Sequence, residues 1–104
     1  MINEKIYREG ILKTEYNYKN GKLDGSEKLF HSNGQLWTER LYKNGLLWDV
    51  VSNYDSTGKA MDPGTLKEGY GIIKLYDAKG KLLEIMKYRE GKFISRQQAN
   101  DSIK

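Results

Sequence analysis

Eight of the eleven glycines recur along the chain at nearly even intervals. Glycine readily adopts the positive φ angles that tight turns need, and short apolar runs separate these positions. The spacing therefore predicts a series of β-hairpins. Repeat chains of this kind usually present a surface to a partner, so we expect a binding protein and not an enzyme. The series consists of Gly10, Gly21, Gly34, Gly45, Gly58, Gly69, Gly80 and Gly91.

The composition fits one domain with a wet surface. The chain has 104 residues, and its eight tyrosines and two tryptophans suit a solvated sheet. The absence of cysteine excludes disulfides, thiol catalysis and cysteine-based zinc sites. No apolar run at the N-terminus is long enough for a signal peptide or a membrane span, so we expect a cytoplasmic protein. We assign residues 1–94 to the repeat domain and 95–104 to a polar tail, which is either a disordered end or a short capping helix.

The chain also resembles itself when it is shifted so that Gly10 falls on Gly34 and Gly21 falls on Gly45. Residues 7–25 and 30–49 both carry Leu, Glu, Tyr and Gly at positions 2, 5, 8 and 11 after their first glycine. A weaker copy covers 76–93, and the copy in 58–71 is interrupted by Pro63-Gly64. The repeating unit is therefore a hairpin with a period of about two strands.

The fold class predicted is all-β, with the hairpins joined into a single antiparallel β-meander. Asn20-Gly21, Asn33-Gly34 and Asn44-Gly45 are the dipeptides that type I′ turns favour, because both central residues need a positive φ. Strands are expected between the turns, with a shorter one near the end and a weak one in the degenerate copy. The ranges are 3–8, 12–18, 24–31, 36–42, 47–54, 71–77, 82–89, 93–96 and, for the weak strand, 60–67.

Side-chain alternation through these turns predicts an apolar patch on one face of the sheet. The opposite face carries Leu36, Thr38, Tyr42 and Leu47. Because a single-layer sheet leaves one face without a partner layer, such a patch is expected to be an interface. For the two tryptophans, packing within the sheet is the alternative interpretation. The patch that we expect to bind a partner consists of Phe30, Trp37, Leu41, Trp48, Val50 and Tyr54.

The repeated units resemble the MORN (membrane occupation and recognition nexus) repeat variant family. The run YKNGKLDG at 18–25, followed by YKNG at 42–45, is similar to the YwqK-type bacterial proteins, which are described as antitoxin components of toxin–antitoxin pairs. The resemblance covers about residues 7–93. It implies an antitoxin or immunity-type protein that binds a toxin encoded nearby.

Few residues suggest chemistry. His31 is the only histidine, and it could act as a general base beside Glu27 or Glu39, although a surface histidine at a strand end is the simpler interpretation. Glu15, Glu39 and Glu84 recur near one repeat position, which favours cross-strand pairing over acid–base catalysis. We therefore expect no catalytic residue, no cofactor and no metal site.

The partner expected is a protein that the chain masks sterically. The alternative is a repeat scaffold that self-associates through exposed strand edges or binds membrane lipid head groups. Nucleic acid is disfavoured, because lysine and arginine are spread along the whole chain instead of being clustered.

Overall fold

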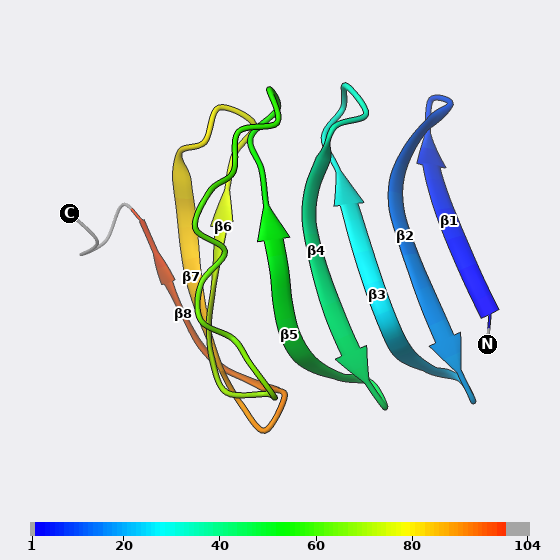
Figure 1. Ribbon diagram of the computed structural model, residues 1–104, viewed down its shortest axis with the longest axis vertical. Coiled ribbons are helices and arrows are strands. Elements are labelled where there is room, and N and C mark those ends of the chain that lie inside the picture. Colours follow the sequence, from blue (N-terminus) through cyan, green and yellow to red (C-terminus); the bar gives the residue numbers. More distant parts are fainter. Residues whose placement is uncertain (1, 100–104) are drawn as a thin grey trace.

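The computed structural model describes residues 2–99, and in this part of the chain every regular element is a β-strand (Figure 1). The all-β prediction is therefore confirmed. Apart from the weak strand expected at 60–67, the predicted strand ranges agree with the observed ones to within a few residues. The strands are β1 (Ile2–Arg8), β2 (Ile11–Lys19), β3 (Lys22–Phe30), β4 (Leu36–Lys43), β5 (Leu46–Asn53), β6 (Gly71–Tyr76), β7 (Leu82–Arg89) and β8 (Lys92–Gln98).

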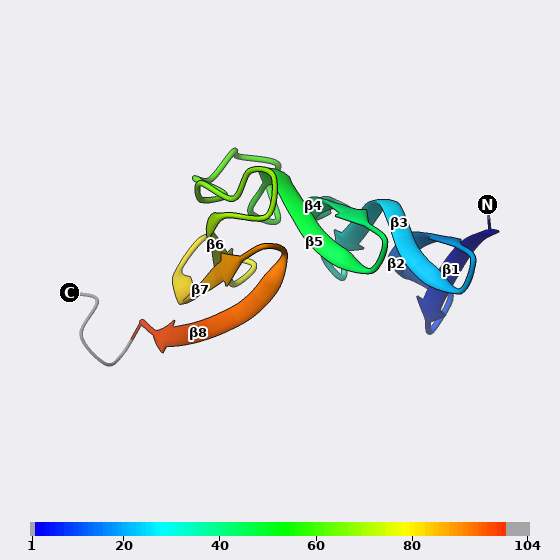
Figure 2. The same ribbon diagram turned by 90° about the horizontal axis from the view of Figure 1, so that it is seen from below.

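The strands form an antiparallel meander that is divided into two sheets. The first sheet has the order β1-β2-β3-β4-β5, and the second has the order β6-β7-β8. Within each sheet, every strand pairs with its neighbour in sequence, as the hairpin pattern predicts. The division falls between β5 and β6, where the repeat is degenerate, and the second sheet turns away from the plane of the first (Figure 2).

The segment between the two sheets folds back along β5. The Val50 amide donates to the Leu66 carbonyl oxygen at 3.2 Å, and the Gly69 amide donates to the Trp48 carbonyl oxygen at 2.8 Å. The strand that we expected at 60–67 is replaced by isolated bridges, including one between Gly64 and Ile73. Pro63 has no amide hydrogen to donate, which is consistent with the absence of a regular ladder there.

Two kinds of turn join the strands. Asn20-Gly21 and Asn44-Gly45 have positive φ at both residues, which confirms the type I′ prediction. At Asn33-Gly34 only the glycine has a positive φ, and the His31 amide donates to the Gln35 carbonyl oxygen at 2.9 Å. This loop is therefore longer than the two-residue turn that we predicted.

The longer loop recurs in the later repeats. The Asp55 amide donates to the Lys59 carbonyl oxygen at 3.0 Å, and the Asp77 amide donates to the Lys81 carbonyl oxygen at 2.9 Å. The Asp55 carboxylate also accepts hydrogen bonds from the backbone amides of Thr57 and Lys59. The shift of one repeat that lays Gly34 on Gly58 also lays His31 on Asp55, so the histidine occupies the place that aspartate takes in these later loops.

β-bulges interrupt the strand pairing at regular positions. Lys13 is the extra residue where Ile6 pairs with Thr14 and Tyr7 with Leu12. Trp37, at the equivalent position of the next repeat, is the extra residue where Leu29 pairs with Thr38 and Phe30 with Leu36. A bulge places two residues opposite one and changes the side-chain phase. The bulges, together with the longer loop, are the reason that simple alternation misplaces side chains in this chain.

The core lies between the two sheets. Leu47, Leu66, Ile73 and Met86 are at most 7% exposed and pack together. All seven residues of β1 are exposed, so the edge of the first sheet far from the core is a thin layer. The molecule measures 42 × 34 × 19 Å, and its apolar packing is concentrated at the end where the sheets meet.

The last strand runs further than we predicted. β8 extends to Gln98, so residues 95–98 of the polar tail continue the second sheet. The alternatives of a disordered end or a short helix for the remainder concern 100–104, which lie outside the described residues.

Candidate functional site

None of the six residues of the predicted patch is fully exposed. All six are half-buried, and they lie along β3, β4 and β5 and just beyond β5. Phe30, Trp37 and Tyr54 lie near the loop that joins β3 to β4, called here the His31 loop. Leu41 lies farther along β4, and Trp48 and Val50 lie in β5. The large apolar side chains that are exposed belong to other positions, mainly in β1 and β8.

Val50 belongs to the core side of the sheet. It lies opposite Arg40 and packs against the cluster that contains Leu47. The prediction placed Val50 on the face opposite to Leu47. That assignment is wrong because Trp48 is an extra residue in the β4–β5 pairing, so the alternation changes phase between Leu47 and Val50.

Trp48 stands at this bulge and contacts the segment that follows β5. Its carbonyl oxygen accepts a hydrogen bond from Gly69 at 2.8 Å, and Lys43 Nζ lies 5.3 Å from the centroid of its ring. A lysine over a tryptophan ring is a cation–π arrangement. Leu41 lies in the adjacent strand, opposite Ser26 and Asp49.

Trp37 is held on several sides. Its Nε1 donates to the Tyr76 carbonyl oxygen at 3.0 Å, which connects the first sheet to β6. Its ring stacks on His31 with 5.3 Å between the ring centroids, and its carbonyl oxygen accepts from the Tyr54 amide at 2.8 Å. Trp37 therefore packs within the molecule, and it also lines the cavity described below.

His31 is buried, with 6% of its surface exposed. The prediction of a surface histidine is therefore wrong. The longer loop folds the ring against Trp37, and Nε2 lies 2.8 Å from the Tyr54 carbonyl oxygen. A carbonyl oxygen only accepts hydrogen bonds, so Nε2 carries the proton. These contacts give the histidine a structural place in the loop.

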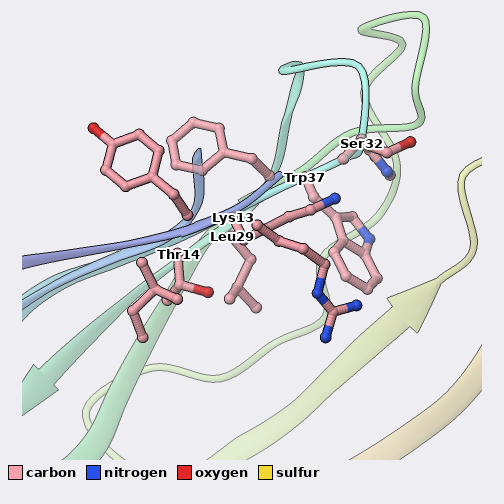
Figure 3. Close-up of a pocket in the computed structure, with 10 residues that line it drawn as sticks. Lys13, Thr14, Leu29, Ser32 and Trp37 are labelled. Atoms are coloured by element: carbon pink, nitrogen blue, oxygen red, sulfur yellow. The ribbon is translucent and has the colours of Figure 1, made fainter. Parts of the chain in front are cut away.

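A cavity of about 630 Å³ opens beside Trp37, at the end of the first sheet near the β1–β2 and β3–β4 turns (Figure 3). Of the six patch residues, Phe30 and Trp37 line it. Figure 3 shows the side chains of Thr14, Leu29 and Trp37 projecting from the same side of the sheet. The cavity is lined by Ile6, Tyr7, Arg8, Lys13, Thr14, Leu29, Phe30, His31, Ser32 and Trp37.

Sequence reasoning missed Arg8, Lys13 and Ser32 as parts of this site. They come from β1, β2 and the His31 loop, and only the folded register places them together. One signal was available, because Lys13 and Trp37 occupy equivalent positions of the two-strand repeat.

The recurring glutamates take part in cross-strand contacts. Lys28 of β3 lies opposite Glu15 on one side and Glu39 on the other. Glu84 lies 3.7 Å from Arg96 Nε and accepts from Gln98 Nε2 at 2.8 Å. These contacts fit the structural interpretation of the three glutamates.

A polar cluster lies beside the core. Arg40 NH1 is 4.0 Å from Glu27 Oε1, and their side chains are only 13% and 14% exposed. Burial raises the pKa of Tyr42 to about 12, and the negative charge of Glu27 adds to this shift. Burial also raises the pKa of Tyr88, the neighbouring phenol from the second sheet. Both phenols therefore stay protonated to a higher pH than an exposed tyrosine does.

The described residues offer no group of three or more His, Cys, Asp or Glu side chains that could hold a metal ion. Within residues 2–99 there is also no helix of the length and apolarity that a membrane crossing requires.

Comparison with known families finds a match within the first sheet. Residues 23–44 match the MORN repeat variant. The matched segment covers most of β3, the His31 loop and β4, which together form one repeat unit of the hairpin series. Searches among curated proteins and among solved structures found no match to this chain.

The match supports the MORN family resemblance that the sequence pattern indicated. MORN repeats are generally binding modules and not enzymes, and they are associated with protein or membrane-lipid binding. The repeat unit of this chain therefore suggests a protein- or lipid-binding module.

Proposed function

We propose that this chain is a non-enzymatic protein-binding module of the antitoxin or immunity type, which acts in the cytoplasm and neutralises a partner toxin by masking its active surface. The observation that carries the proposal is the position of the matched repeat. Residues 23–44 include Phe30, Trp37 and Leu41, which are three of the six residues that we assign to binding.

Binding would use the tryptophans as anchors. Trp37 and Trp48 are half-buried; the Trp37 indole donates to the Tyr76 carbonyl oxygen, and Lys43 lies over the Trp48 ring. Little side-chain freedom is therefore lost when a partner covers them. Phe30, Leu41 and Tyr54 supply apolar area around the anchors. Val50 supports them from the core side of β5.

The first experiment is capture of the partner. The tagged chain is incubated with its native lysate, and the bound proteins, including products of the adjacent genes, are identified by mass spectrometry. The proposal predicts one stoichiometric protein encoded nearby. Recovery of no specific protein would contradict it.

The second experiment tests the residues with the purified pair. Trp48→Ala and Phe30→Ala should each weaken the complex about 10-fold or more, the effect of losing an interface anchor of about 1.4 kcal/mol. Phe93→Ala is the matched control, because Phe93 is an exposed aromatic residue of β8 outside the patch. Equal affinities for all three variants, with circular dichroism unchanged, would remove the patch from the proposal.

The alternatives make different predictions. A lipid-binding module would sediment with vesicles that contain anionic lipid at low salt. A self-associating scaffold would show a mass that rises with concentration in light scattering, because the exposed edge strands β1 and β8 invite pairing. A protein that stays monomeric and does not sediment with these vesicles would exclude both alternatives.

A further inference from the structure

The cavity beside Trp37 is formed by two bulges at the same level of the sheet. Lys13 is the extra residue at one bulge and Trp37 at the other, and both line the cavity. Bulges bend a sheet locally, which accounts for a hollow at this place. Its volume of about 630 Å³ falls within the ordinary range of small-molecule sites, roughly 300–1,000 Å³.

The charge of the lining has one sign. Arg8 and Lys13 are its cations, and the lining contains no aspartate or glutamate. Among residues 2–99, neither cation has an ion pair or a side-chain hydrogen bond. The hydroxyls of Thr14 and Ser32 also make no side-chain hydrogen bond within that range, so four side chains with hydrogen-bond donors remain available to an acceptor.

The apolar wall of the cavity is already fixed. The hydrogen bond from Trp37 to Tyr76 and the stacked His31 ring, which is itself bound to the Tyr54 carbonyl oxygen, hold the indole in place. A fixed aromatic ring loses little conformational entropy when a flat group packs against it.

A second hollow, at the repeat-equivalent place in the other sheet, lacks this charge. It is lined by Lys81 and Glu84 among mainly apolar residues, and Glu84 already contacts Arg96 and Gln98. Of these two hollows, only the cavity beside Trp37 therefore has an excess of free cations.

We propose that the cavity beside Trp37 binds a small anion that carries a planar ring, with the ring against Trp37 and Leu29 and the carboxylate or phosphate at Arg8 and Lys13. The hydroxyls of Thr14 and Ser32 complete the donors around the anion. This site shares Phe30 and Trp37 with the partner-binding patch proposed above, and its test does not require that partner.

The test is a titration of the ¹⁵N-labelled chain followed by NMR. The probes are phenyl phosphate, benzoate and benzamide, the last being the neutral isostere of benzoate. We expect one or both anions to give saturating shifts at the Trp37 indole N–H and at the amides of β1 and β3 near the cavity. The Trp48 indole serves as an internal control and should stay unchanged. Whether phosphate or carboxylate binds more tightly identifies the anionic group.

Variants assign the charges. Arg8→Gln and Lys13→Gln should each weaken the anion about 10-fold, the effect of losing one charge-assisted contact. Lys19→Gln, an exposed lysine at a turn outside the cavity lining, is the matched control and should bind as the unmodified chain does. The spectra themselves show whether each variant is folded.

Three results would overturn the proposal. The first is an absence of saturating shifts with either anion up to about 10 mM, well above the dissociation constant of about 1 mM expected for so small a ligand. The second is benzamide binding as tightly as benzoate and phenyl phosphate. The third is unchanged affinity in both Arg8→Gln and Lys13→Gln.

Discussion

At the scale of single residues, the turns set the hairpin pattern and also hold residues other than glycine at positive φ angles. Glu9-Gly10 has the same pair of positive φ angles as Asn20-Gly21 and Asn44-Gly45, but its first residue is a glutamate with φ of 52°. Asparagine tolerates this conformation better than other side chains do, because its short amide can bond locally. Glutamate at this position is therefore strained by its backbone conformation.

The first prediction is that Glu9→Asn stabilises the protein, by about 1 kcal/mol at most, since it removes part of this left-handed strain. The reciprocal change, Asn20→Glu, should destabilise it by a similar amount. Urea unfolding followed by circular dichroism measures both changes. Equal midpoints for the two variants and the unmodified chain would show that these turns carry no such strain.

The second prediction concerns Tyr42 and alkaline pH. The phenol has an ordinary pKa of 10.0 and a pKa of about 12 in the folded chain, so the folded state holds this proton more tightly than the unfolded state. Its contribution to stability is complete below pH 10 and is lost as the pH rises toward about 12. Tyr42→Phe should therefore make the alkaline fall in stability shallower. The same slope in both proteins, measured by urea unfolding at several pH values, would contradict this.

At the scale of elements, the strands were predictable and the bulges were not. The turns at Asn20-Gly21 and Asn44-Gly45 were predictable, because few residue pairs favour a positive φ at both positions of a two-residue loop. Asn33-Gly34 instead closes a longer loop, in which the Gln35 amide donates to Asn33 Oδ1 and the His31 ring stacks on Trp37. Side-chain alternation predicted the correct face of a strand only up to the next bulge, where the phase changes.

The third prediction tests how the segment after β5 joins the second sheet. A Cβ on Gly64 would clash with the Ile72 carbonyl oxygen, and the φ of Gly64 is 107°. Gly64→Ala should therefore cost about 3 kcal/mol or more. Gly34→Ala is the matched control, because Gly34 also has a positive φ but no atom within 4 Å of its Cβ position. That control should cost about 1–2 kcal/mol.

The two free energies of unfolding decide this point. A loss in Gly64→Ala no greater than in Gly34→Ala would mean that the bridge between Gly64 and Ile73 is not held in solution.

At the scale of the whole molecule, stability should be uneven. The buried residues Leu47, Ile73 and Met86 lie at the junction of the two sheets, whereas β1 is exposed along its whole length. The candidate site follows the same division. Trp37 and Trp48 could be proposed as anchors from the sequence alone. Arg8 and Lys13 could not be assigned to the cavity, because several chain segments must pack together to form its lining.

The fourth prediction is therefore a gradient of hydrogen exchange. Amides of β5, β6 and β7 should exchange with free energies near that of global unfolding, while amides of β1 and the β1–β2 turn should exchange through local opening. Uniform protection from β1 to β7 would contradict the core assignment, and native-state exchange read by NMR resolves the two cases.

Neutralisation of a partner is the central claim, and growth measures it most directly. The protein captured with this chain is expressed alone and together with the chain in a bacterial host. The account predicts that the partner stops growth alone, that the chain restores growth, and that Trp48→Ala restores it less than Phe93→Ala does. A partner that is harmless alone, or one whose toxicity the chain leaves unchanged, would contradict the account.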